Sequence, residues 1–151
     1  MIKKVGGQTY MKRKIFSWAL VVIWMVLIFY LSHQPATESN KLSTNITEKI
    51  VEVVEKVIPS NKFDIRRFNH IIRKNAHFFA YLVLGILVSN GISAGSKSGS
   101  KIVVIAILIC VLYAISDEFH QLFVPGRGGQ VRDVIIDSAG SIVGILLYNR
   151  F

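Results

Sequence analysis

Two polar stretches stand directly beside long apolar runs of this chain. The first, residues 116–121, reads Ser-Asp-Glu-Phe-His-Gln and follows the apolar run 101–115. The second lies just before the last apolar run and contains Arg127, Arg132, Asp133 and Asp137. Ionisable side chains this close to membrane-length apolar segments are costly to bury, and they usually serve a function. The two stretches therefore predict where the chemistry or recognition takes place.

These side chains could support acid–base chemistry on an anionic substrate. His120 or His77 would act as the general acid or base near neutral pH, with Asp117 orienting the imidazole. Arg127 and Arg73 would hold a phosphate or another anion. This arrangement fits an intramembrane or interfacial hydrolase or transferase acting on a lipid-linked envelope substrate, although it offers no clear nucleophile.

The same residues also fit a membrane protein without catalytic activity that binds lipid. In that interpretation Arg127 pairs with Asp133 or Asp137, and His120 pairs with Asp117, so that the charges hold short helices together. The residues expected to bind a ligand are Arg73, Lys74, Glu118, Gln121, Arg127, Asp133 and Asp137. The sequence leaves open whether the site is catalytic.

Two further functions have weaker support in the sequence. His77, His120 and either Asp117 or Glu118 are acceptable ligands for zinc or another divalent cation. Glu118 and His120 lack the HExxH spacing, however, so we predict no metal ion and no other cofactor. Proton-coupled transport through buried acids would need a dimer, because four short helices make a thin wall around a pathway.

The composition indicates a membrane protein. Of the 151 residues, 52% are hydrophobic, and the mean hydropathy of +0.47 is too high for an ordinary soluble domain of this size. The formal net charge of +9 comes from basic residues that flank the apolar runs. We therefore expect anionic lipid headgroups, and no nucleic acid, as partners. Cys110 is the only cysteine, which excludes a disulfide within one chain.

Four apolar runs predict an all-α integral membrane protein with a bundle of four transmembrane helices. The runs span residues 15–31, 75–90, 102–116 and 134–148. Each is somewhat shorter than the roughly 20 residues of an ideal span. They form one membrane domain over residues 15–151, after a basic segment of residues 1–14. Between the first two runs, apolar residues at steps of three or four predict an extracytoplasmic amphipathic helix over residues 42–58. This helix either lies on the membrane surface or covers the bundle. The alternative is a solvated helix that only connects the two runs.

Basic residues around the runs predict the orientation of the helices. Five Lys or Arg and no acid precede the first run, Lys97 and Lys101 lie between the second and third runs, and Arg150 follows the last. The positive-inside rule then places both termini in the cytoplasm of a multi-pass protein of the cell membrane. Both polar stretches and the start of the second run then lie at the extracytoplasmic face. Four basic residues oppose the rule and would meet lipid phosphate there: Arg66, Arg67, Arg73 and Lys74.

Helical spacing places part of the polar set on two inward-facing lines. On the second helix the line repeats every four residues and consists of Arg73, His77, Tyr81 and Gly85. On the fourth helix the line consists of Asp133, Asp137, Ser141 and Ile145. Beside that line, Gly140 and Gly144 form a small-xxx-small pair, which permits close contact between helices.

At these positions the chain resembles the VanZ-like family of small polytopic membrane proteins. The motifs are residues 73–81, residues 116–121, Pro125-Gly126-Arg127, Asp133-Val134, Asp137 and Gly140 to Gly144. The resemblance covers most of the chain, from the first span onward. The family's namesake is associated with low-level resistance to glycopeptide antibiotics, especially lipid-tailed ones such as teicoplanin. The resemblance implies a cell-envelope protein that affects susceptibility to amphiphilic compounds.

Overall fold

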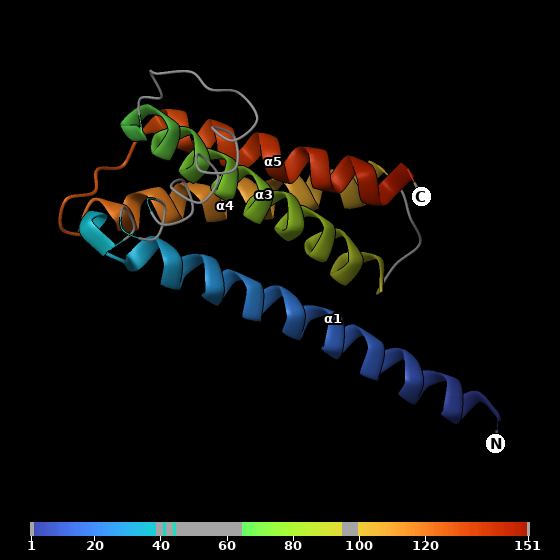
Figure 1. The fold of residues 1–151 in the computed structure, drawn as a ribbon. Coiled ribbons are helices and arrows are strands. Elements are labelled where there is room, and N and C mark those ends of the chain that lie inside the picture. Colours follow the sequence, from blue (N-terminus) through green and yellow to red (C-terminus); the bar gives the residue numbers. More distant parts are fainter. Residues whose placement is uncertain (1, 39–40, 42–43, 45–64, 95–99, 151) are drawn as a thin grey trace, which may run out of the picture.

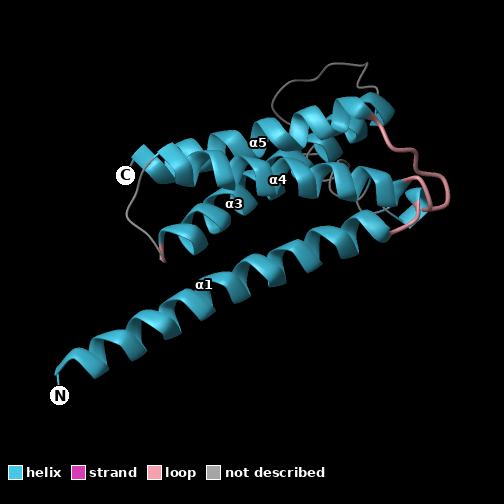
Figure 2. Ribbon diagram, turned by 180° about the vertical axis from the view of Figure 1, so that it is seen from behind, coloured by secondary structure: helices cyan, strands magenta, loops and turns pink. Residues whose placement is uncertain are grey.

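The computed structural model describes residues 2–38, 41, 44, 65–94 and 100–150. The long helices are α1 (Ile2–His33), α3 (Ile65–Ser93), α4 (Ser100–Gln121) and α5 (Val131–Arg150). The described residues contain no β-strand, so the predicted all-α fold is confirmed for them (Figure 2). Apart from Thr44, the amphipathic helix predicted at residues 42–58 lies outside the described residues.

Each helix extends beyond the apolar run that predicted it. α1 begins at Ile2, so basic residues of the N-terminal segment belong to the first helix instead of preceding it. Its 32 residues rise about 48 Å, which exceeds the roughly 30 Å apolar thickness of a bilayer. α4 likewise continues to Gln121 and includes the whole polar stretch 116–121. The polar residues thus extend the helices beyond the apolar runs.

Among the described helices, three are long and apolar enough to cross a membrane. These segments are Tyr10–His33, Ile71–Ser93 and Lys101–Gln121. The fourth predicted span is also a helix, but α5 carries Arg132, Asp133, Asp137 and Arg150. This density of ionisable groups removes α5 from the candidates, so the predicted count of four spans is not confirmed. The coarser prediction of a membrane protein with apolar helices is supported.

Successive helices of the bundle run in opposite directions. α3 and α5 both start at one end of the bundle, where Lys74 contacts Asp133, and they run parallel to each other. α1 and α4 finish at that end, where Ser32 contacts Asp117. Figure 1 shows α3, α4 and α5 packed together, with α1 beside them and its N-terminal part leaving the bundle. Both termini lie toward the opposite end of the molecule.

Glycines bring the backbones of α3 and α5 into contact, as the small-xxx-small pair predicts. A Cβ atom on Gly140 would collide with the carbonyl of Phe78, and one on Gly144 would collide with the carbonyl of Leu82. On the facing helix, Gly85 lies just as close to the backbone of α5. This close packing fixes how the polar side chains at the start of α3 and α5 are placed relative to each other.

The bundle buries polar side chains and exposes apolar ones. Asp117, Glu118 and Asp137 are only 2%, 5% and 0% exposed. Large apolar side chains face outward on every long helix, for example Ile23, Phe79, Leu112 and Ile135. The bundle thus combines an apolar core with buried carboxylates and an apolar outer surface, which suits a protein whose solvent is lipid.

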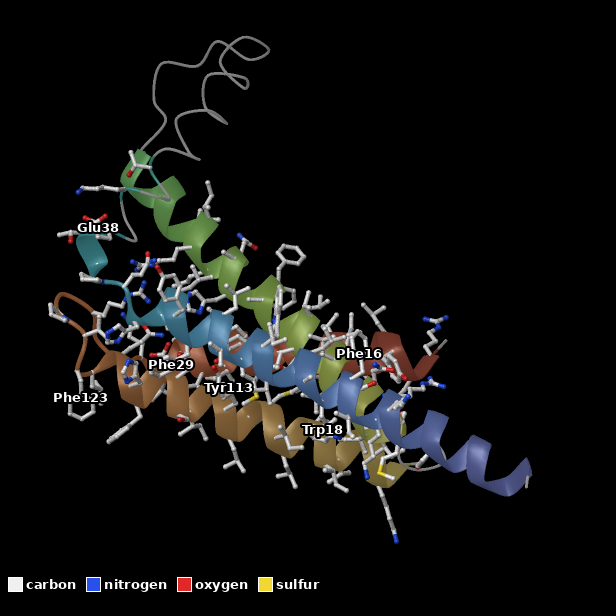
Figure 3. All side chains as sticks on the ribbon, turned by 90° about the horizontal axis from the view of Figure 1, so that it is seen from below. Phe16, Trp18, Phe29, Glu38, Tyr113 and Phe123 are labelled. Atoms are coloured by element: carbon white, nitrogen blue, oxygen red, sulfur yellow. The ribbon has the colours of Figure 1, made fainter. Side chains whose placement is uncertain are left out.

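Two hydrogen bonds attach the middle of α1 to the rest of the bundle. The hydroxyl of Tyr113 donates to the carbonyl of Met25 at 2.6 Å, and the indole of Trp24 donates to the carbonyl of Ala80 at 2.9 Å. Figure 3 shows Tyr113 and Phe29 in the layer between α1 and α4. These contacts hold the middle of α1 against α3 and α4.

Candidate functional site

The polar stretches meet in a pocket at one end of the bundle. Its cavity volume is about 120 Å³, and residues of α3, α4, α5 and the loop 122–130 line it. The lining includes Arg73, Lys74, His77, Glu118, Gln121, Arg127, Asp133 and Asp137. The structure thus brings the expected ligand-binding residues together around one cavity.

The loop 122–130 is tied to the end of α4 by a buried carboxylate. Glu118 accepts a hydrogen bond from the backbone N–H of Gln130 at 2.8 Å and another from the side-chain amide of Gln121 at 3.3 Å. Within the loop, Gly126 has a φ of 74°, a left-handed conformation that glycine adopts without strain. Glu118, which the sequence suggested as a ligand-binding residue, therefore anchors the loop that closes the pocket.

Arg127 lies on this loop and is held by neutral groups. It donates to the carbonyl of Leu31 at 3.2 Å and to the side-chain oxygen of Gln121 at 3.5 Å, and its buried Nε has no partner among the described residues. Burial, and secondly the nearby charge of Arg73, lower the pKa of Arg127 from its usual value. An arginine nevertheless stays charged in proteins. In the described part of the chain, neither arginine has a carboxylate within ion-pair distance.

The acids of α5 have other partners than Arg127. Asp133 accepts a hydrogen bond from the ammonium of Lys74 at 2.7 Å, and Oδ2 of Asp137 lies 3.7 Å from Nδ1 of His77. The predicted pairing of Arg127 with Asp133 or Asp137 is therefore wrong. Because Lys74 is neutralised by Asp133, the unpaired positive charge at the pocket belongs to the two arginines.

Beside the pocket, three helices bring one imidazole and two carboxylates together. His77 of α3, Asp117 of α4 and Asp137 of α5 each offer one ligand atom, and these three atoms lie within 4.8 Å of one another. Oδ2 of Asp117 accepts hydrogen bonds from the hydroxyls of Ser32 at 2.9 Å and Tyr81 at 3.3 Å. Oδ1 of Asp117 and both carboxylate oxygens of Asp137 are buried and have no hydrogen-bond partner in the described structure. Buried polar atoms are normally paired, so this cluster needs an explanation.

His120 contacts α1 and does not line the pocket. Its Nε2 lies 2.9 Å from Nδ1 of His33, and the ring of Phe29 packs on it at a centroid distance of 4.3 Å. The predicted pairing of His120 with Asp117 is therefore wrong. Of the three catalytic candidates, the structure groups His77 with Asp117 and separates His120 from them.

A comparison with protein families adds independent support to the motif resemblance. The model of the VanZ/LLP1 family matches residues 16–151, a range that includes every residue lining the pocket and the His77–Asp117–Asp137 cluster. The chain belongs to the VanZ/LLP1 family. No curated protein and no solved structure matches it. In this VanZ-like protein, residues of the motifs 73–81, 116–121 and 125–127 supply most of the charged lining of the pocket.

Proposed function

We propose that this VanZ-like protein binds the anionic, phosphate-bearing headgroup of a lipid-linked envelope compound in its polar pocket. The observation that carries the proposal is the convergence of Arg73 and Arg127 on one small cavity without an acidic partner. By holding such a headgroup, the protein would change how lipid-tailed glycopeptides and other amphiphilic compounds reach their targets in the cell envelope.

The charges of the pocket favour an anion. Arg73 and Arg127 are both partly withdrawn from water and lie near enough to influence each other electrostatically. Two like charges in such a site repel, and a bound anion removes that repulsion. Guanidinium groups suit phosphate in particular, because their donors match two oxygens at once.

The size of the pocket favours a headgroup over a whole amphiphile. A cavity volume of about 120 Å³ is small beside the roughly 300–1,000 Å³ of pockets that enclose a drug-sized ligand. The apolar part of a ligand would therefore stay outside. Phe119, Leu122 and Phe123, which are 62%, 56% and 71% exposed, lie at the same end and would contact acyl chains, and Figure 3 shows Phe123 projecting from the loop.

Direct binding to the purified protein in a neutral detergent tests the proposal. The probes are inorganic phosphate and a short-chain phosphatidylglycerol, followed by calorimetry. Arg127→Gln and Arg73→Gln should each raise the Kd about 10- to 100-fold, because a charged hydrogen bond contributes about 1.5–3 kcal/mol. Binding of the lipid but not of free phosphate would identify a headgroup recognised together with its chains.

Arg132→Gln is the matched control, since Arg132 is an exposed arginine that does not line the pocket. It should leave the Kd unchanged within about twofold, apart from ionic-strength effects. An equal loss in all three variants would mean that general surface charge attracts the probe. That result, or no binding of either probe to the unmodified protein, would contradict the proposal.

The pocket is proposed to open at the extracytoplasmic face, with α5 as a fourth span and both termini inside. In a Cys110→Ser background, cysteines at Asn75 and Gly128 should react with a membrane-impermeant maleimide in intact cells. A cysteine at Arg150 should react only after the membrane is opened. Labelling of Asn75 and Gly128 from opposite sides would contradict the position of the pocket, and labelling of Arg150 in intact cells would contradict the fourth span.

An enzyme acting on a lipid-linked envelope substrate is the second candidate. The observation in its favour is that His77 and Asp137 line the same pocket as the two arginines, so an acid–base group would stand beside the bound phosphate. His77→Gln should then abolish turnover of a lipid-linked substrate while phosphate binding persists. Turnover that survives this substitution would exclude His77 as the acid or base.

A further inference from the structure

We infer that His77, Asp117 and Asp137 form a binding site for one divalent transition-metal ion, Zn²⁺ or Mn²⁺, at the inner wall of the pocket. This site consists of the buried cluster alone and does not depend on the proposed anion binding. The ligand set differs from the one that the sequence suggested. His120 contacts His33 and is not a ligand, and Asp137 takes the place of His120.

The ligand atoms are close enough to share one ion. Nδ1 of His77 and Oδ2 of Asp137 are 3.7 Å apart, and one ligand atom from each of the three residues lies within 4.8 Å of the other two. Two ligand atoms that each bind a metal at 2.0–2.2 Å stand about 3–4 Å from each other. The distance between His77 and Asp137 already fits, and Asp117 needs only a small side-chain movement.

Three of the four carboxylate oxygens of Asp117 and Asp137 have no hydrogen-bond donor among the described residues, so they are available as metal ligands. Asp137 is 0% exposed, yet neither of its oxygens accepts a hydrogen bond from a described residue. Asp117 is 2% exposed, and its Oδ1 is also unpaired. Unpaired carboxylates are very unfavourable in a buried site, and two of them balance the charge of one divalent cation.

The nearby protein cations do not fill this role. Lys74 donates to Asp133, one turn before Asp137 on α5. Arg127 donates to Leu31 and Gln121 and forms no ion pair with Asp117 or Asp137. Among the described residues, His77 is therefore the one basic side chain in contact with the carboxylates.

Asp117 also has the outer contacts expected of a metal ligand. Ser32 and Tyr81 both donate to Oδ2, which fixes the orientation of the carboxylate and leaves Oδ1 free for the ion. Hydrogen bonds from neighbouring residues that orient a metal-binding side chain are a general feature of metal sites. These two hydroxyls come from α1 and α3, so the orientation of Asp117 depends on the assembled bundle.

The donor set limits the kind of ion. One imidazole and two carboxylates suit zinc or manganese, whereas calcium prefers six to eight oxygen ligands and magnesium retains most of its water. Three protein ligands leave at least one coordination position open. Because His77 and Asp137 line the pocket, that position would face the cavity.

The test uses the full chain in detergent, stripped with a chelator and then exposed to Zn²⁺, Mn²⁺ or Mg²⁺ alone. We expect one Zn²⁺ or Mn²⁺ per chain by elemental analysis after gel filtration, and little Mg²⁺. The thermal midpoint should rise by about 5–10 °C at 100 times the Kd and fall again on chelation. Substoichiometric retention of all three ions, with no thermal shift, overturns the inference.

Variants then locate the ion. Asp137→Asn, Asp117→Asn and His77→Gln should each weaken binding at least tenfold, and Tyr81→Phe should weaken it by about tenfold because it removes one outer contact. Glu38→Gln, at an exposed acid outside the pocket lining, should keep the affinity of the unmodified protein. Equal weakening by Glu38→Gln would place the ion elsewhere and overturn the inference.

Two further measurements separate metal binding from misfolding and from anion binding. If the ligand variants fail to fold, Tyr81→Phe and the chelator titration of the unmodified chain still decide between a bound ion and protonated carboxylates. Arg127→Gln should bind Zn²⁺ normally, so failure of anion binding and failure of metal binding are separate outcomes.

Discussion

Gly144→Ala is expected to lower the free energy of unfolding by about 1–3 kcal/mol, although alanine normally favours a helix. In a helix interior, replacing glycine by alanine contributes roughly 0.5–1 kcal/mol of stability. At Gly144 the added methyl would collide with the backbone carbonyl of Leu82, which cannot move without moving α3. The clash therefore outweighs the propensity gain, and a leucine at this position should prevent folding altogether.

Gly91→Ala is the matched control for this prediction. Gly91 also lies in a helix, but a Cβ there would meet the ring of Trp18 at 3.4 Å, an ordinary van der Waals distance. Gly91→Ala should therefore be neutral or stabilising. Unfolding midpoints in one detergent compare the two variants. A stabilising effect of Gly144→Ala would show that α3 and α5 are not in backbone contact.

The packing of α3 and α5 also determines the site. α3 carries Arg73 and His77, and α5 carries Asp133 and Asp137. If the helices move apart, the Lys74–Asp133 ion pair and the contact between His77 and Asp137 both lengthen. Gly144→Ala should therefore weaken ligand binding as well as stability.

The helices and their buried faces could be predicted from the sequence because the signals are local. Apolar runs show where the helices lie, and four-residue spacing shows which side chains share a face. Gly140 and Gly144 stand on the face of α5 that packs on α3, as their spacing indicates. The ends of the helices were less predictable, since polar residues such as Gln121 continue a helix as readily as they end it.

The pairing of the charges could not be predicted, because it depends on contacts between distant parts of the chain. Arg127 was expected to pair with an acid of α5, yet the loop directs it to the carbonyl of Leu31 at the end of α1. Ser32 donates to Asp117, 85 residues away, and no spacing rule connects the two. His33 reaches His120 for the same reason: α1 and α4 finish side by side.

Glu118→Ala is expected to cost about 1.5–3 kcal/mol of stability and to weaken anion binding through the loop. Glu118 is 5% exposed, and its carboxylate accepts the backbone N–H of Gln130 at 2.8 Å. Removing it leaves that donor without its acceptor and frees the loop that positions Arg127. The anion affinity measured by calorimetry and the midpoint of unfolding should therefore both fall in this variant.

Glu118→Gln distinguishes an anchor of the loop from a residue that binds the ligand through its charge. The amide oxygen of glutamine can still accept the N–H of Gln130, so most of the stability and the anion affinity should remain. Removing a negative charge beside the two arginines should even strengthen binding of an anion slightly. Glu38→Ala is the control for the loss of an acidic side chain, because Glu38 is exposed and lies outside the pocket lining. If Glu118→Gln impairs anion binding as severely as Glu118→Ala while stability persists, the charge of the carboxylate itself is needed for binding, and anchoring of the loop is not its main role.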